Sequence, residues 1–317
     1  MKTLVIILFT CTILGCSGNT NNQIPDSNGE ERLTEADYSE RDTIVYRIHN
    51  LQEAANLIDS LNYTPEAWQA GIREVPRLNW MKIPERWRTS TSKELEVKVK
   101  KQVFFRVLAP LALESNEDIK EERQHLLKLM EKTSDSWSAD DRNWIDTLAE
   151  KYKVSLEDES AAFRELQQRV DIIPLSLALT QSAEESGWGT SRFAAEGNAL
   201  FGQWAWGKDA MKPKEQREGM GDYGLRKFDT PLQSMEAYML NLNTHNAYKA
   251  LRERRAELRS AGQPVTGAEL AKTLIKYSER GEEYVETLLS IMRVNYLAQG
   301  DDAYLGDGPV ILVVPVD

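Results

Sequence analysis

Helix-forming patterns, bounded by helix-start and helix-stop residues, cover most of this 317-residue chain. Ser138 followed by Asp141 is a capping-box signal, Thr230 precedes a proline as helix starts often do, and Gly187 is typical of a helix end. No fixed-period repeat and no run of strands is found, so the pattern predicts a mainly α protein. Apolar residues at helical spacing include Val103, Phe104, Val107, Leu108, Trp144, Ile145, Leu148, Leu175, Ala178, Leu179, Leu232, Met235 and Met239.

Four stretches complete the pattern. Residues 43–61 also place apolar side chains at helical spacing, so we expect a helix there. Residues 71–87 (GIREVPRLNWMKIPERW) contain two prolines and are expected to be an extended connection. Residues 208–229 are rich in glycine and predict a loop with a short β-hairpin. The tail GPVILVVPVD has a strand-like composition, and its sequence indicates no function.

Charge and rare residues exclude several protein classes. The chain has 50 acidic and 39 basic residues and a net charge of −11, which argues against a nucleic-acid binder. Two cysteines and three scattered histidines leave neither a disulfide scaffold nor a zinc site, so no metal and no cofactor are expected. One basic cluster is expected to be a solvated helix face, or otherwise a contact for an anionic polymer; it consists of Arg252, Arg254, Arg255 and Arg259.

The N-terminus reads as a targeting segment. Residues 1–16 (MKTLVIILFTCTILGC) have one lysine and an apolar stretch that is too short to span a bilayer. The ILGC ending resembles the lipobox of bacterial lipoproteins, which implies lipidation of Cys16 and loss of Cys11; a plain cleaved signal is the alternative. Polar residues 17–41 would form a tether. Since Ser17 is not an inner-membrane retention signal of the Asp type, we expect an outer-membrane anchor facing the periplasm if the organism has two membranes.

The most informative stretch is QSAEESGWGTSRFAAEGNALFGQWAWG, residues 181–207. Glu185 falls in the last turn of a predicted helix, where the helix dipole disfavours a carboxylate and raises its pKa, as a general acid requires. Aromatic residues beside a carboxylate suit a sugar, whose ring faces stack while its hydroxyls form hydrogen bonds. A surface glutamate at a frayed helix end beside core aromatics is the alternative. The residues expected to bind substrate are Trp188, Asn198, Phe201, Trp204 and Trp206.

The ESGWG segment followed by TSRFAAEGNALFGQW resembles the Bax-type branch of the bacterial endo-β-N-acetylglucosaminidases, glycoside hydrolase family seventy-three. The similarity begins near residue 75, continues through VKKQVFFRVLAPL and DDRNWIDTLAEKY, and ends around residue 298. It implies a lysozyme-like helical glucosaminidase domain with a small β-hairpin at 161–300, an N-terminal helical extension at 42–160 and a tail at 301–317. In this family the glutamate of ESGWG is the catalytic acid, which is Glu185 here.

Further catalytic residues are also implied by the resemblance. A second carboxylate comes from the hairpin region, where REGMGDYGLRKF favours Glu218 over Glu215 and Asp222. Tyr248 matches the tyrosine of the family's NxxxY-like segment, and would position the substrate's N-acetyl group or stabilise charge; an ordinary packing role is equally open.

The sequence departs from the family pattern at two places. Ala199 stands where a second asparagine is usual, so one polar contact to substrate or backbone is lost, and Phe228 replaces a common tyrosine. Neither change affects the acid at Glu185.

Together these features predict a lipid-anchored hydrolase of peptidoglycan glycan strands that cleaves the β-1,4 bond after N-acetylglucosamine. The reaction could be inverting, retaining or assisted by the substrate's acetamido group, and the sequence does not choose among the three. A muramidase or lytic transglycosylase is the enzymatic alternative, and a non-catalytic glycan-binding lipoprotein is the alternative from another class. Protein partners and oligomeric state are not predicted.

Overall fold

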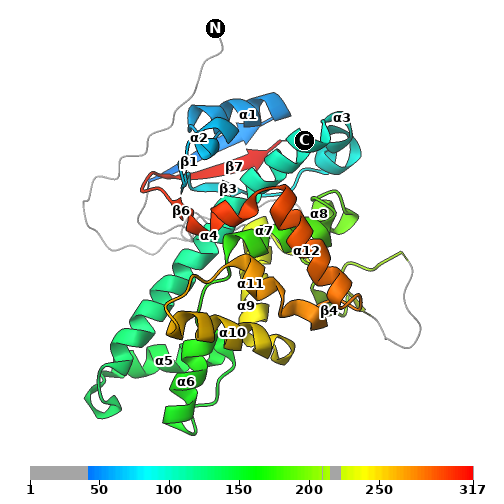
Figure 1. Cartoon of the computed structure of the whole chain (residues 1–317). Helices are drawn as coiled ribbons and strands as arrows, with labels where there is room; N and C mark the ends of the chain where they lie inside the picture. The colour runs from blue at the N-terminus through cyan, green and yellow to red at the C-terminus, as the bar shows by residue number, and fades with distance from the viewer. Residues whose placement is uncertain (1–41, 209, 215–222, 317) are drawn as a thin grey trace. The chain divides into compact units, whose positions relative to one another are not determined.

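The computed structural model describes residues 42–208, 210–214 and 223–316. Helices dominate these residues, which confirms the mainly α prediction (Figure 1). The helices are α1 (Leu51–Ser60), α2 (Pro65–Gln69), α3 (Ser92–Glu94), α4 (Val97–Met130), α5 (Ala139–Tyr152), α6 (Glu159–Arg169), α7 (Leu175–Ser186), α8 (Arg192–Gly197), α9 (Pro231–Thr244), α10 (Lys249–Ser260), α11 (Gly267–Ala271) and α12 (Glu282–Val294). The strands are β1 (Thr43–Ile48), β2 (Glu74–Val75), β3 (Leu78–Trp80), β4 (Trp204–Trp206), β5 (Tyr223–Leu225), β6 (Tyr304–Leu305) and β7 (Val310–Pro315).

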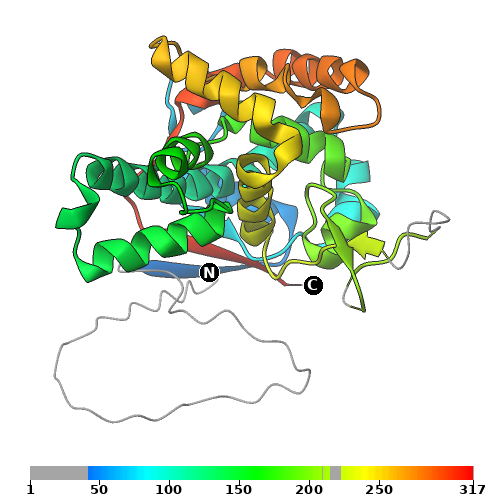
Figure 2. The same cartoon turned by 90° about the horizontal axis from the view of Figure 1, so that it is seen from below.

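A three-stranded parallel sheet joins the two ends of the described chain. The strand order is β1-β7-β3, with Thr43 opposite Val310 and Leu78 opposite Ile311. Figure 2 shows β7 running beside β1. The strand-like tail of the sequence is therefore the central strand of this sheet, and its Val313 is fully buried.

The predicted helix over residues 43–61 is wrong in its first part. Residues 43–48 form β1, and α1 begins only at Leu51, after Asn50 caps its first turn by accepting from the backbone N–H of Glu53. The segment TIVYRI is rich in β-branched and aromatic residues, and pairing with β7 decides its conformation. The stretch 71–87 is extended as expected and contributes β2 and β3.

Three predicted helix boundaries are confirmed. Gly187 ends α7 in the left-handed conformation at φ 58°, and the Thr230 side chain caps α9 by accepting from the N–H of Gln233. Ser138 and Asp141 form the reciprocal capping box at the start of α5. The hairpin is also present, since β4 pairs antiparallel with β5. Its first strand lies before residue 208, earlier than the predicted segment.

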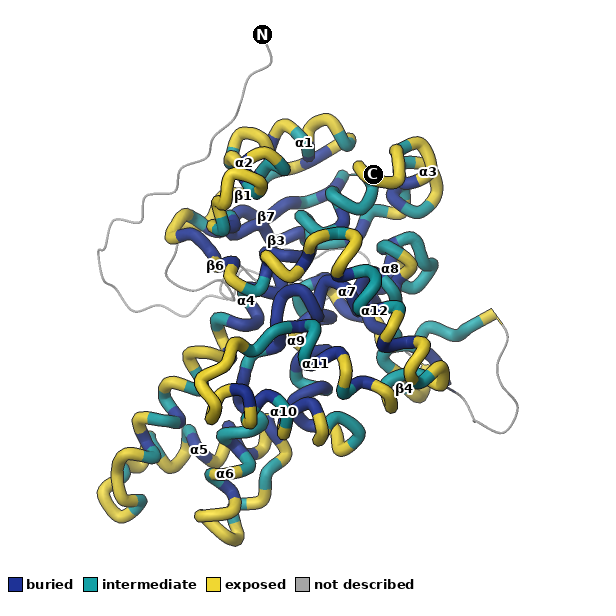
Figure 3. The backbone as a smooth tube through the Cα atoms, in the orientation of Figure 1, coloured by how far each residue is buried: buried dark blue, intermediate teal, exposed yellow. Residues whose placement is uncertain are grey.

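One apolar core connects the sheet to the central helices. It contains Leu108 of α4, Leu177 of α7, Leu242 of α9 and Val313 of β7, and Figure 3 shows the buried backbone of this region in dark blue. A smaller core, around Leu166, lies between the far end of α4 and helices α5 and α6. The main core includes residues on both sides of the predicted boundaries at 160 and 300, and those boundaries stay predictions.

Two arginines of α10 are buried, so the expected solvated face is wrong for them. Arg252 donates to the carbonyls of Leu242, in the last turn of α9, and His245, directly after it. Arg255 is fully buried and donates to the carbonyls of residues 168, 171 and 172, in the segment before α7. These residues fix the entry of the chain into α7.

Candidate active site

Glu185 lies in the last turn of α7, as the sequence predicts. Its side chain is partly buried, and burial raises the pKa of the carboxyl. A hydrogen bond from Tyr284 opposes that rise in pKa, the charge of Glu184 adds to it, and the charge of Arg280 opposes it. Because burial is the largest of these effects, the protonated acid is favoured at a higher pH than for an exposed glutamate.

A chain of hydrogen bonds leads from the core to Glu185. The hydroxyl of Tyr238 donates to Oε1 of Gln181 at 2.6 Å, and Nε2 of Gln181 donates to the hydroxyl of Tyr284 at 3.0 Å. The Tyr284 hydroxyl in turn donates to Oε1 of Glu185 at 2.7 Å. Each donor therefore has its own acceptor, and the Tyr284 proton is directed at the carboxylate.

Tyr284 is the neighbour of Glu185 that sequence reasoning missed. It lies in α12 and is buried, and nothing in the local pattern EEYVETLL separates it from an ordinary core tyrosine. Its ring stacks on Tyr277 at a centroid distance of 5.4 Å and an interplanar angle of 2°. Tyr277 in turn meets Tyr248 at 5.5 Å.

Tyr248, which is predicted to be catalytic, lies in the same tyrosine cluster. Among the described residues, Glu185 accepts a hydrogen bond from Tyr284 and not from Tyr248. Burial raises the pKa of its hydroxyl, a hydrogen bond with Asn241 opposes the rise, and the charge of Glu185 adds to it. The charge of Glu185 thus affects the pKa of Tyr248 although the two side chains form no hydrogen bond.

The two carboxylate oxygens of Glu185 face different surroundings. Oε1 accepts from Tyr284, whereas Oε2 faces Gly202, where an added Cβ would lie 3.9 Å away. Gly202 has φ +63°, a conformation that favours glycine in this turn. The adjacent Glu184 is held away by an ion pair with Arg280 at 2.6 Å. Oε2 is therefore the oxygen of Glu185 that accepts no hydrogen bond from the described residues.

Two of the predicted aromatic residues present exposed rings. Trp204 is 45% and Trp206 is 68% exposed, and both belong to strand β4. Trp204 stacks on Tyr223 of β5 at 5.0 Å, which holds its ring in place. Such anchored, exposed indoles are suited to stack on the apolar face of a sugar ring.

The part of the chain that contains Glu185 is similar to known proteins. The sequence model of the mannosyl-glycoprotein endo-β-N-acetylglucosaminidase family matches residues 160–297. Protein bax from Escherichia coli (strain K12) is 35% identical over 198 residues, covering 62% of this chain and 70% of the relative. The chain belongs to the Bax-type glucosaminidase family. The crystal structure of the catalytic domain of the autolysin Auto from Listeria monocytogenes covers 68% of this chain and 96% of its own, at 17% identity and a TM-score of 0.37.

Two of the aromatic residues predicted to bind substrate in this glucosaminidase, Trp188 and Phe201, pack against other rings. The Trp188 ring packs edge-to-face on Phe104 at 5.7 Å, and its carbonyl accepts from the indole N–H of Trp87. Phe201 is buried and stacks on Tyr238 at 3.8 Å, so it supports the hydrogen-bond chain from behind. The structure gives neither ring an exposed face like those of β4.

Asn198 is 7% exposed, and its amide is used inside the protein. Its Oδ1 accepts from the N–H of Ile83, and its Nδ2 donates to the carbonyls of Phe228 and Asp229. It therefore connects the end of α8 to two other segments of the glucosaminidase. The neighbouring Ala199 is also buried, so the missing asparagine is replaced by packing.

The remaining predicted residues lie outside the described part of the chain. These are the lipidation candidate Cys16 and the hairpin carboxylates Glu215, Glu218 and Asp222. Within residues 42–208, 210–214 and 223–316, no group of three or more metal-ligating side chains is close enough to hold an ion. Across the same residues, no helix has the length and apolar character needed to span a membrane.

Proposed function

We propose that this glucosaminidase is a peptidoglycan hydrolase that cleaves the β-1,4 bond after N-acetylglucosamine, with Glu185 as general acid. The observation that carries the proposal is the partly buried Glu185 carboxyl, with its raised pKa and its hydrogen bond from Tyr284, at the glutamate of the family's ESGWG segment. Because burial raises its pKa, this carboxyl holds its proton to a higher pH than an exposed glutamate, which suits it to deliver a proton to a leaving-group oxygen.

In the proposed reaction, Oε2 of Glu185 gives its proton to the glycosidic oxygen as the bond to the anomeric carbon breaks. The departing sugar leaves as an alcohol, and the electron pair of the broken bond stays on its oxygen. Glu185 becomes a carboxylate, and the hydroxyl of Tyr284 stabilises this new charge through the 2.7 Å hydrogen bond. A water oxygen then bonds to the anomeric carbon and its proton passes to a carboxylate, which is the second carboxylate in an inverting reaction and Glu185 in a retaining one.

The substrate would lie along the β4-β5 hairpin, against the exposed indoles of Trp204 and Trp206. The second carboxylate of the reaction is proposed to be Glu218, with Glu215 and Asp222 as the other candidates of the same segment. Replacing each one singly by its amide tests this assignment: the residue whose amide variant loses cleavage is the second carboxylate. Unchanged activity in all three variants would favour assistance by the substrate's acetamido group.

The test of the acid is Glu185→Gln, with Glu184→Gln as the matched control. We expect the first variant to lose at least about 100-fold in the release of fragments from purified peptidoglycan, the lower range for a general acid. The control should stay close to the unchanged protein, because Glu184 is paired with Arg280 at the surface. Mass spectrometry of the products identifies the bond, since reducing N-acetylglucosamine ends are expected.

Reducing or anhydro-muramic acid ends would instead indicate a muramidase or a lytic transglycosylase. Binding to sacculi without released fragments, unaffected by Glu185→Gln, would indicate a glycan-binding lipoprotein. Either result contradicts the proposed activity.

The proposal includes a lipid anchor at Cys16, on the basis of the ILGC ending. We propose that the anchor holds the enzyme at the outer membrane, facing the periplasm, in an organism with two membranes. Cys16→Ala should move the protein from the membrane fraction to the soluble fraction, whereas Cys11→Ala should leave it in the membrane. The anchor assignment is wrong if the Cys16→Ala variant stays in the membrane fraction. It is also wrong if acyl labelling marks neither the unchanged protein nor the variant.

A further inference from the structure

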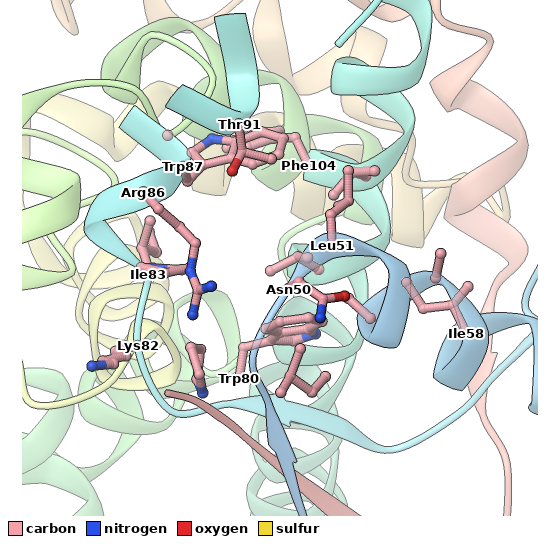
Figure 4. A pocket seen from close by; sticks show the side chains of 18 of the residues that line it. Asn50, Leu51, Ile58, Trp80, Lys82, Ile83, Arg86, Trp87, Thr91 and Phe104 are labelled. Carbon is pink, nitrogen blue, oxygen red and sulfur yellow. The ribbon is translucent and has the colours of Figure 1, made fainter. Parts of the chain in front are cut away.

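An apolar cavity lies between α1, the parallel sheet and α4, and Glu185 is not among its lining residues (Figure 4). Its volume is about 180 Å³, somewhat larger than the roughly 150 Å³ of an engineered apolar cavity that binds benzene. Helix α1 contributes Leu51, Ala55 and Ile58, and α4 contributes Val103 and Phe104. The sequence patterns give no sign of this cavity, because its walls come from segments far apart in the chain.

The lining of the cavity is almost entirely hydrocarbon. Trp80 and Trp87 add large apolar rings, and the small Ala55 leaves space that a larger side chain on the same helix face would fill. An unfilled apolar cavity lowers stability in proportion to its volume, because the atoms around it lose contacts. A hydrocarbon ligand would restore those contacts, whereas water would find few polar partners there.

The charged groups of the lining are both positive. Arg86 and Lys82 line the cavity, and no acidic side chain does so among the described residues. The guanidinium of Arg86 donates to the carbonyls of His49 and Val316, which are neutral groups that orient it without cancelling its charge. Figure 4 shows this guanidinium directed toward the open space between Ile83 and Asn50. The guanidinium of Arg86 therefore complements an anion.

A buried hydrogen-bond donor in the cavity wall also favours a ligand with an oxygen acceptor. Trp80 is 7% exposed, and its indole N–H has no hydrogen-bond partner in the described part of the chain. Buried donors in proteins are normally paired, so an unpaired one in a cavity wall favours a ligand with an acceptor oxygen.

We propose that this cavity binds a single aliphatic chain that carries a carboxylate head, as in a fatty acid. The chain occupies the space between α1 and α4, and the head lies beside Arg86. Glu185 does not line this cavity, although Gly189 of the same ESGWG segment does, and the proposal does not depend on the activity assigned to Glu185.

The binding test uses the purified full chain and decanoate below its micelle-forming concentration, measured by isothermal titration calorimetry. We expect saturable binding of one decanoate per chain. Affinity should rise about fourfold per methylene from hexanoate to decanoate, because each buried methylene contributes ~0.8 kcal/mol and 1.4 kcal/mol is tenfold. Decyltrimethylammonium, which has the same chain and a cationic head, should bind at least about tenfold more weakly.

The matched variants are Ala55→Phe and Gln52→Phe in the same helix. Ala55 lines the cavity, so the added ring fills it and decanoate binding should fall at least about tenfold. Gln52 is exposed and does not line the cavity, so its variant should bind like the unchanged protein. Arg86→Gln should reduce the ratio of the affinity for decanoate to the affinity for decyltrimethylammonium. Both affinities are measured on the same sample, so an unfolded fraction of the variant does not change this ratio.

Three results would overturn the proposal. They are an affinity that does not change with chain length, equal binding of the cationic amphiphile, and decanoate binding that survives Ala55→Phe in a variant that circular dichroism shows to be folded. The apolar N-terminal segment is present in every variant, so binding to it would appear as the third result.

Discussion

Replacing Tyr284 by phenylalanine removes the one hydroxyl that donates to Glu185 among the described residues. The ring and its stacking on Tyr277 stay, so the change is confined to the hydrogen bonds. In the ground state Tyr284 donates to a neutral acid, and in the transition state it donates to a developing carboxylate. A neutral hydrogen bond contributes about 1 kcal/mol and one to a charged group about 1.5–3 kcal/mol, so the transition state gains about 0.5–2 kcal/mol more.

That difference predicts a fall in kcat of about 2- to 30-fold for Tyr284→Phe, since 1.36 kcal/mol corresponds to tenfold. The pH profile should change as well. Catalysis needs the protonated acid, so activity falls as the pH rises past the pKa of Glu185. The Tyr284 hydrogen bond lowers that pKa, and its removal should move the basic limb of the profile to higher pH. Initial rates of fragment release from purified peptidoglycan, measured across acidic and neutral pH, give both quantities.

Tyr277→Phe is the matched control. Tyr277 is a buried tyrosine of the same cluster, but its hydroxyl meets the carbonyl of Phe201 at 3.5 Å rather than Glu185. Its variant should keep kcat and the basic limb near those of the unchanged protein. Wild-type kcat and an unmoved limb in Tyr284→Phe would refute a positioning role for Tyr284, and so would an equal loss in the control.

Three other changes have defined outcomes. Glu185→Gln should raise the melting temperature at neutral pH but not at low pH. The raised pKa means that the folded state binds more protons than the unfolded one, so stability falls as pH rises through the interval between the two pKa values. Trp206→Ala should weaken glycan binding in a sacculus pull-down while changing the free energy of unfolding by no more than about 0.5 kcal/mol, because the ring is 68% exposed. Gly267→Ala should destabilise by about 1–3 kcal/mol in urea unfolding, because its Cβ would lie 2.7 Å from the backbone nitrogen of Leu177; Gly308→Ala, with open space around it, should not.

The sequence predicts those parts of the fold that local chemistry decides. Ser138, Gly187 and Thr230 act through hydrogen bonds and backbone conformations within a few residues, and all three mark the observed helix ends. Glu185 is placed in the last turn of α7 for the same reason. Its surroundings could be inferred only in part, because Tyr284, which donates a hydrogen bond to it, comes from the distant helix α12.

The failures of prediction have a common physical cause in contacts between distant segments. Residues 43–48 have a helical apolar spacing, but partners in β7 make them a strand. Arg255 looks like a surface residue of a charged helix, but the free carbonyls before α7 give it buried partners. Asn198, which is predicted to contact substrate, has hydrogen-bond partners from distant segments, Ile83 and the residues after β5. Periodicity and motif spacing carry no information about such partners.

The central position of β7 has a consequence for the order of folding. Its two neighbours, β1 and β3, come from the beginning of the described chain, so both pairings close very long loops. Contacts of this kind form slowly, whereas the helices around α7 and α9 rely on shorter-range contacts and can form earlier. Ile48, Trp80 and Pro315, one residue from each strand, line the apolar cavity, so the cavity is complete only when this late step has finished. An occupant of the cavity would hold the three strands together and slow the first opening of the protein during unfolding.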